Sequence, residues 1–279
     1  MARSLRQFWV YLLPAGTLAV MVAALSVFIT DSDAPEDTMT TLTVYCADEV
    51  RLPVEQIVDH FQRRSGIRVH AHFQPSDRLT AQMNQAGDGD LVIAADESVL
   101  QPAHSQQTNR QTHPVAYLAA VMLVRSETPH NIHTVADLAG PEVKLGVPVA
   151  ETLIAAVTSA IFRKNDIDME RIVLNRAFSG GSSAELAQAV ELGQVDAAIV
   201  WPTAAQQYAY RTEMIEIPPD HNVMIPIVAA GLTPSSHPDA VRQFLEFLNS
   251  PVAQESFEKY GLITVGGGFV GFAVGVGCQ

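Results

Sequence analysis

Basic residues and cysteines are both scarce in this chain of 279 residues. Lys and Arg number 17 against 30 Asp and Glu, so the net charge is −13. Binding to nucleic acid or to anionic lipid requires a basic face, so neither is expected as a partner. The two cysteines, Cys46 and Cys278, are too few for a disulfide scaffold or a four-cysteine zinc site.

The sequence also lacks the short motifs that carry common enzyme chemistry, including GxSxG, the P-loop, HExxH and CxxC. Its nine histidines are scattered. His70 and His72 lie two apart on an expected strand and would form at most half of a metal site. Cys46 ends an expected buried strand, where a small core residue is the usual interpretation. We therefore predict a protein that is not an enzyme and has no cofactor and no bound metal.

The pattern of the N-terminus predicts an export signal. Arg3 and Arg6 precede an uncharged run of 23 residues at positions 8–30, and an acidic segment follows it. About 20 apolar residues span a bilayer, and this charge order directs the C-terminal part out of the cytoplasm. We expect residues 1–34 to be a signal peptide or a membrane anchor, with a linker to about residue 40. The length favours an uncleaved anchor, and cleavage after Ala34 is the alternative.

Strand and helix patterns alternate through the rest of the chain. Strands are expected at residues 41–46, 67–73, 91–94, 115–124, 144–147, 197–200 and 223–230. Helices are expected at residues 53–65, 78–85, 135–138, 152–164, 184–192, 238–248 and 252–260. This alternation predicts an α/β protein with mostly parallel sheets.

Three expected strand-to-helix turns are rich in polar residues. They contain Asp48 and Glu49, then Ser76 and Asp77, then Ser182 and Ser183. In open α/β sheets, ligands bind beyond the carboxyl ends of strands, and helix N-termini there favour anions. Taken singly, each turn is explained by helix capping alone.

Taken together and in order, these turns resemble those of the periplasmic molybdate-binding protein family, a group of type II solute-binding proteins. The resemblance runs from about residue 42 to 262. It rests on LTVYCADEVRLPVEQIVDHF, FQPSDRLTAQMNQAGDGDLVIAAD, AELAQAVELGQVDAAIVW and VRQFLEFLNSPVAQESFEKYGL. It implies the two-lobed type II fold, in which each lobe is a mixed, mostly parallel sheet flanked by helices. Lobe 1 would comprise residues 41–118 and 226–262 and lobe 2 residues 119–225, followed by a Gly-rich apolar tail at 263–279.

The resemblance also implies a function and a site. Members of this family hold an oxyanion between the lobes with neutral donors and deliver it to the permease of an ABC importer, usually as monomers. Molybdate or tungstate would be the ligand here. By position, Ser76 matches a binding serine, Ser183 and the region of Thr152 match backbone donors, and Trp201 replaces a tyrosine. The expected ligand-binding set is Asp48, Glu49, Ser76, Asp77, Thr152, Ser182, Ser183 and Trp201.

Glu49 departs from this pattern, because the family usually has a serine or another small residue there. A carboxylate about 4 Å from an anion costs roughly 4 kcal/mol per charge pair at an effective dielectric constant of about 20. Glu49 would pair with Arg51 or Arg78 and leave the donors free, or the pocket would take a different solute, such as a cation or an amine. The third alternative is a sensor or interaction module in which ligand binding is altered or lost.

Overall fold

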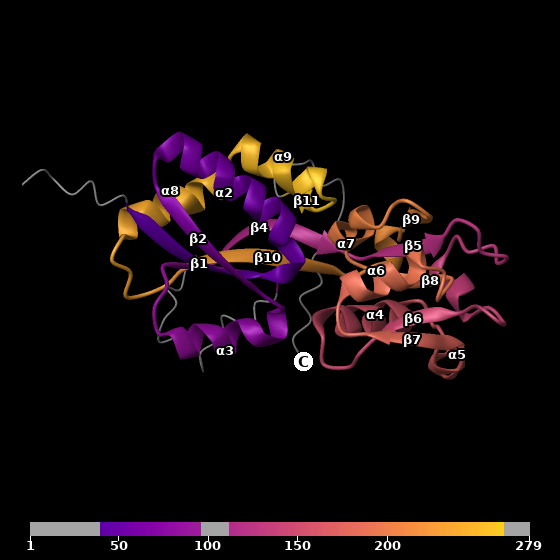
Figure 1. Ribbon diagram of the computed structural model, residues 1–279. Helices are drawn as coiled ribbons and strands as arrows, with labels where there is room; N and C mark the ends of the chain where they lie inside the picture. Colours follow the sequence, from indigo (N-terminus) through magenta and orange to yellow (C-terminus); the bar gives the residue numbers. More distant parts are fainter. Residues whose placement is uncertain (1–39, 96–111, 265–279) are drawn as a thin grey trace, which may run out of the picture. The chain divides into compact units, whose positions relative to one another are not determined.

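The computed structural model describes residues 40–95 and 112–264 (Figure 1). The predicted N-terminal signal or anchor lies outside these residues, as does all but the beginning of the predicted tail. Among the described residues, no helix has the length and apolar character needed to cross a membrane. The predictions for both ends of the chain therefore stay predictions.

One part of the fold, which we call lobe 1, is built on a six-stranded sheet. Its strands are β1 (Thr41–Ala47), β2 (Arg68–Gln74), β3 (Leu91–Ala94), β4 (His113–Ala119), β10 (Met224–Gly231) and β11 (Ile263–Thr264). They lie in the order β11-β4-β10-β3-β1-β2. Strands β1, β2 and β3 are parallel to one another, because each is connected to the next by a helical crossover.

The second part, lobe 2, is built on a five-stranded sheet. Its strands are β5 (Val121–Arg125), β6 (Leu145–Pro148), β7 (Arg176–Gly180), β8 (Ala197–Val200) and β9 (Thr212–Glu216). They lie in the order β7-β6-β8-β5-β9. The expected α/β fold with two lobes is therefore observed, while the residue limits predicted for the lobes stay predictions.

The prediction of mostly parallel sheets was wrong. Among the described strands, five of the nine pairings are antiparallel. The chain leaves lobe 1 along β4 and returns along β10, so these neighbours must run in opposite directions. It likewise enters lobe 2 along β5 and leaves along β9. Connections between the lobes thus make both sheets mixed.

The apolar stretch at residues 115–124, expected as one strand, is divided between β4 and β5 at Ala120. No charged residue, glycine or proline in residues 115–124 indicates where one strand ends and the next begins. The connection that returns from β9 to β10 lies beside Ala120. Asn222, 5% exposed, donates from Nδ2 to the carbonyl oxygen of Ala120 at 2.8 Å and to that of Ile217 at 3.4 Å. One amide therefore joins the two connections between the lobes.

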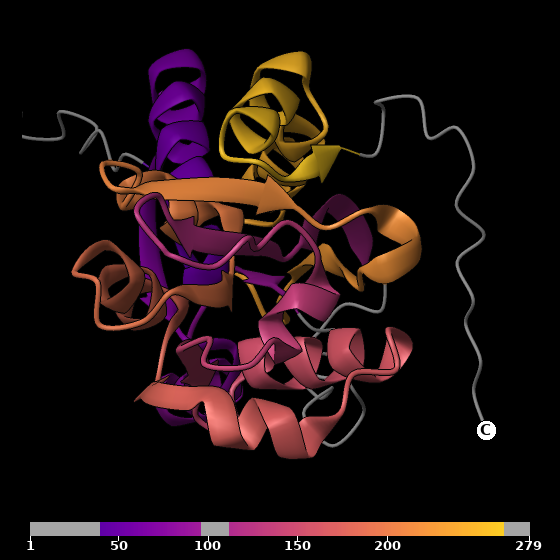
Figure 2. The ribbon, with the colours of Figure 1, turned by 90° about the vertical axis from the view of Figure 1, so that its right-hand side faces the viewer.

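The helices are α2 (Arg51–Ser65), α3 (Ser76–Ala86), α4 (Leu153–Lys164), α5 (Met169–Asn175), α6 (Ser183–Glu191), α7 (Pro202–Gln207), α8 (Pro238–Leu248) and α9 (Pro251–Lys259). Short 3₁₀ segments lie at η1 (Asp48–Val50), η3 (Val135–Ala139) and η4 (Pro219–His221). Helices α2, α8 and α9 cover one face of the six-stranded sheet, and α3 covers the other (Figures 1 and 2). The aromatic ring of Phe61 on α2 packs edge-on against Phe244 on α8, with ring centres 4.8 Å apart. Helices α5 and α7 and strands β7 and β9 were not predicted.

Candidate functional site

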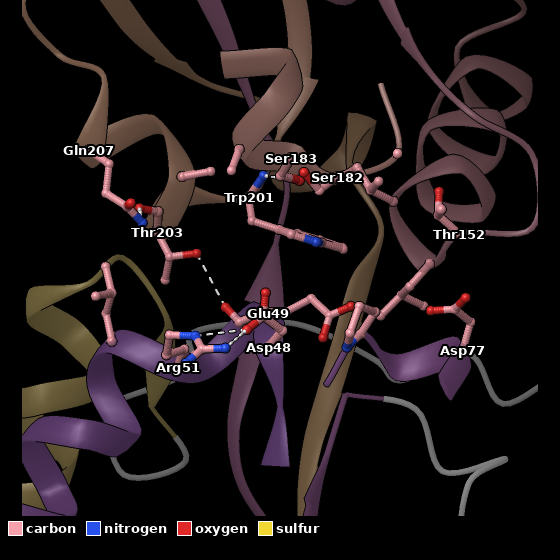
Figure 3. Close-up of a pocket in the computed structure, with 17 residues that line it drawn as sticks. Asp48, Glu49, Arg51, Asp77, Thr152, Ser182, Ser183, Trp201, Thr203 and Gln207 are labelled. Carbon is pink, nitrogen blue, oxygen red and sulfur yellow. Dashed lines mark hydrogen bonds and ion pairs between the residues drawn. The ribbon is translucent and has the colours of Figure 1, made fainter. Parts of the chain in front are cut away.

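A cavity of about 220 Å³ lies where polar turns of the two lobes meet (Figure 3). Pockets for drug-sized ligands usually measure about 300–1,000 Å³, so this cavity suits an ion or a very small molecule. Seven of the eight predicted site residues line it: Asp48, Glu49, Asp77, Thr152, Ser182, Ser183 and Trp201. The eighth, Ser76, is 7% exposed and does not line the cavity itself, but its hydroxyl donates a hydrogen bond to Glu49, which does.

The strand order explains why these residues converge. Segment η1 begins directly after β1, α3 follows β2, α4 follows β6, and α6 follows β7. The cavity therefore lies beyond the carboxyl ends of strands from both sheets, which is the usual ligand position in open α/β folds. That any of these residues binds a ligand stays a prediction.

Helix α4 presents its first turn to the cavity. The Thr152 hydroxyl accepts from the Ala155 N–H at 3.3 Å and donates to the Val149 carbonyl oxygen at 2.9 Å. Thr152 therefore acts as the helix cap, and its hydroxyl is already fully used as a donor. The N–H groups of Leu153 and Ile154, which also line the cavity, have no hydrogen-bond partner among the described residues. Such groups carry the partial positive charge of a helix N-terminus.

Helix α6 presents a second N-terminus. Ser182 caps it by accepting from the Glu185 N–H at 3.2 Å. The Glu185 carboxylate accepts from the Gly181 N–H at 2.8 Å, one residue away from the partner that the capping-box spacing predicted. The N–H groups of Ser183 and Ala184 line the cavity and lack partners in the described part of the chain. Two helix N-termini thus supply four available donors on the lobe 2 side.

Trp201 closes the same side of the cavity. It is 3% exposed, and its backbone N–H donates to the Ser183 Oγ at 3.2 Å. This bond uses the Ser183 oxygen as an acceptor and leaves the hydroxyl hydrogen available. The Trp201 indole N–H has no partner among the described residues and adds a further donor.

On the lobe 1 side, the Glu49 carboxylate lies at the N-terminus of α3. The Ser76 hydroxyl donates to Glu49 Oε2 at 3.0 Å, and the Ser76 N–H donates to Oε1 at 3.4 Å. Burial raises the pKa of Glu49, and hydrogen bonds from backbone N–H groups and from Ser76 offset only part of that rise. The serine expected to bind a ligand is therefore occupied by a carboxylate of the same chain.

The alternative in which Glu49 pairs with Arg51 or Arg78 is not observed. The Arg51 Nε donates to Asp48 Oδ1 at 2.8 Å, since Arg51 lies one helical turn beyond Asp48. Its guanidinium also stacks 4.5 Å from the centre of the Phe73 ring. Arg78 lies beside Asp77, with the closest N and O atoms 4.0 Å apart. Glu49 has no ion pair among the described residues.

Sequence reasoning missed Thr203, on α7. Its hydroxyl donates to the Glu49 carbonyl oxygen at 3.2 Å, which joins α7 of lobe 2 to η1 of lobe 1 (Figure 3). The available signal was Pro202, which follows a buried strand and occupies the first turn of the helix. Proline is favoured at that position and could have predicted α7.

Other candidate chemistry does not reach the cavity. In the described ranges, no group of three or more His, Cys, Asp or Glu side chains is placed to hold a metal ion. Cys46 is a free, fully buried thiol in β1, and burial, followed by the nearby Glu49 and Asp48, raises its pKa well above the ordinary value. His72 stacks on the Tyr45 ring, with centres 5.6 Å apart.

The chain is similar to several known binding proteins. A relative from Mycobacterium tuberculosis, named molybdate-binding protein ModA, is 23% identical over 261 residues, which cover 91% of this chain and 98% of the relative. The substrate-binding domain of a putative molybdenum ABC transporter from Clostridium difficile has a TM-score of 0.69 at 17% identity, covering 81% of this chain and 99% of that one. The sulfate-binding protein SubI from M. tuberculosis has a TM-score of 0.68 at 17% identity, covering 82% and 88%.

At these identities, the likeness to solved structures shows the fold alone. The family is shown by a sequence model of bacterial extracellular solute-binding proteins, which matches residues 42–263. This range includes every described residue that lines the cavity. The resemblance to periplasmic molybdate-binding proteins found in the sequence is thereby confirmed, and the chain belongs to the bacterial extracellular solute-binding protein family.

Proposed function

We propose that this chain is an extracytoplasmic solute-binding protein that captures a small oxyanion between its two lobes and delivers it to the permease of an ABC importer. Molybdate and tungstate are the first candidates, because relatives named for molybdate and molybdenum match most of the chain. The sulfate-binding neighbour widens the candidates to other tetrahedral oxyanions. No enzymatic activity is proposed for this member of a binding-protein family.

The observation that carries the proposal is the set of available donors on lobe 2. The N–H groups of Leu153, Ile154, Ser183 and Ala184 line one cavity at the start of two helices. A charge at a helix N-terminus gains about 0.3–1 kcal/mol when exposed and up to about 2 kcal/mol when partly buried. Donors of this kind hold an oxyanion by hydrogen bonds and dipoles, with no need for a cationic side chain.

A second function is favoured by one observation, the occupation of Ser76 by Glu49. A carboxylate that already accepts both hydrogen bonds of Ser76 takes the place of a ligand at that residue. In that case the protein serves as a sensor or an interaction module on a binding-protein fold, with altered or lost ligand binding.

Thermal unfolding of the full-length chain with added ligands tests these alternatives. The panel contains molybdate, tungstate, sulfate, phosphate, divalent metal ions and small amines. A ligand at 100 times its dissociation constant stabilises the folded state by about 2.7 kcal/mol, which raises the melting temperature of a domain of this size by roughly 5–10 °C. A rise with an oxyanion supports the transport function. A rise with amines or metal ions alone contradicts it, and no rise with any compound favours the second function.

A further inference from the structure

The two sides of the cavity differ in the hydrogen-bonding groups that they offer. Lobe 2 offers available N–H donors at two helix N-termini and the Trp201 indole. On lobe 1, both the hydroxyl and the N–H of Ser76 are occupied by the Glu49 carboxylate. At Ser76, lobe 1 therefore presents a carboxylate acceptor to a ligand, where lobe 2 presents donors.

No cation offsets this acceptor. Among the described residues that line the cavity, Arg51 is the sole cationic side chain, and it is held by Asp48 and stacked on Phe73. The remaining charged groups of the lining are the carboxylates of Asp48, Glu49 and Asp77. A bare oxyanion oxygen that faces Glu49 would thus meet a like charge, while an oxygen that carries a hydrogen would donate it to the carboxylate.

We propose that Glu49 is the specificity-determining residue of this cavity and that it admits an oxyanion only when one proton lies between its carboxylate and the ligand. The cavity therefore favours tetrahedral oxyanions that carry their own proton, such as hydrogen phosphate, over fully deprotonated ones such as sulfate. Oxygens on the far side of the ligand accept from the helix N-termini of α4 and α6. This inference rests on the proposed function and changes the order of its candidates. Molybdate and tungstate are fully deprotonated at neutral pH, so they should, like sulfate, bind less tightly than hydrogen phosphate.

A fully deprotonated oxyanion has one route into the site, in which Glu49 itself takes up the proton. The raised pKa of Glu49 makes that protonation easier than for an exposed glutamate. The charged groups near Glu49 are Asp48 and Arg51 beside it and Asp77 on α3. The buried thiol of Cys46 on β1 is also nearby and is uncharged, because its pKa is raised. Lobe 2 faces it with uncharged groups, including Thr203 and Trp201. The affinity for sulfate should therefore rise by up to about tenfold for each unit by which the pH falls, until Glu49 is protonated.

Phosphate and sulfate form a matched pair of probes, because they have nearly the same shape and differ in the proton. Isothermal titration calorimetry on the full-length chain would measure both dissociation constants at about pH 8 and about pH 5.5. At pH 8 we expect phosphate to bind at least about 100-fold more tightly than sulfate, since a site built to accept a ligand hydrogen rejects analogues that lack it. At pH 5.5 the ratio should shrink, because sulfate then binds with uptake of a proton.

Two variants isolate the role of Glu49. Glu49→Gln replaces the carboxylate with an amide that can both donate and accept, so the preference for phosphate should fall to within about tenfold and the pH dependence of sulfate binding should disappear. Glu49→Ser is the second variant. It removes the carboxylate and releases the Ser76 donors, so it should also reduce the preference for phosphate. Asp77→Asn is the charge control. It removes one carboxylate from the same rim without touching Ser76, so it should change both affinities by a similar factor and leave their ratio in place.

Each of several results would overturn the inference. Equal binding of sulfate and phosphate by the unmodified chain at pH 8 would do so, as would a ratio that Glu49→Gln leaves unchanged. A shift of the ratio by Asp77→Asn equal to that of Glu49→Gln would assign the effect to total charge. If no oxyanion binds to the unmodified chain, to Glu49→Gln or to Glu49→Ser at either pH, the proposed function fails as well, which separates the two failures.

Discussion

A carboxylate placed at the start of α6 should stabilise the protein and abolish oxyanion binding at the same time. Ala184 is the second residue of this helix, is half-buried and lines the cavity. In the Ala184→Asp variant, the new carboxylate lies within reach of the unpaired N–H groups of the first turn. It then occupies the position that we propose for a ligand oxygen.

The two effects have opposite signs and separable magnitudes. An acidic residue in the first turn of a helix typically adds about 0.3–1 kcal/mol of stability. Against a bound anion about 4–6 Å away, the same charge costs roughly 3–4 kcal/mol per charge pair at an effective dielectric constant of about 20. The dissociation constant should therefore rise by about 100- to 1,000-fold, since about 1.4 kcal/mol corresponds to a factor of ten.

Urea unfolding of the full-length chain measures the first effect, and calorimetric titration with the oxyanion that raises its melting temperature measures the second. Ala184→Asn is the matched control, because it has nearly the same shape without the charge, and it should retain binding within about tenfold. An Ala184→Asp variant that binds the oxyanion as tightly as the Asn variant would refute the assignment of α6 to the site.

Two further predictions concern stability. Asp196, 3% exposed, accepts hydrogen bonds from Arg125 at 2.6 Å and from the Lys144 N–H at 2.9 Å. Asp196→Ala should therefore lower the free energy of unfolding, measured in urea, by about 3–5 kcal/mol. A decrease of less than about 1 kcal/mol would contradict this role of Asp196. Because the pKa of Glu49 is raised in the folded state, its protonation favours folding at low pH and that contribution is lost as the pH rises through the folded-state value. The melting temperature of Glu49→Gln relative to the unmodified chain should therefore increase between pH 4 and pH 7, and a constant or decreasing difference would show that the sign is wrong.

The predictions from sequence succeeded where one local pattern determines the outcome. The helix at residues 238–248 agrees with α8 in both limits, because Pro238 starts it and the apolar side chains of Val241, Phe244 and Leu248 repeat on its buried face. The three polar turns were assigned to one site because their order along the chain resembles that of the family, and they do line one cavity although they follow strands of two sheets. Strand β9 was missed because it lies at the edge of its sheet and has little buried surface, which leaves a weak apolar pattern.

The remaining errors concern contacts between distant segments. The division of residues 115–124 at Ala120 depends on which sheet each half joins, and a continuous apolar run does not encode that choice. The sequence singled out Glu49 as unfavourable for anion binding, and an ion pair with Arg51 or Arg78 was one of the alternatives that it left open. The structure pairs Glu49 with the neutral donors of Ser76, while Arg51 is held by the closer Asp48. Which groups pair with Glu49 and Arg51 thus depends on their distances in the folded chain and not on charge alone.

The amide of Asn222 has a mechanical consequence for ligand exchange. Its bond to Ala120 ties the two connections between the lobes together, and its bond to Ile217 stiffens the return connection, so we expect the two connections to bend as one unit. A paired connection of this kind resists twisting and sliding but still permits bending. We therefore expect the cavity to open by a rotation with its axis close to Asn222, with the polar turns of each lobe moving together.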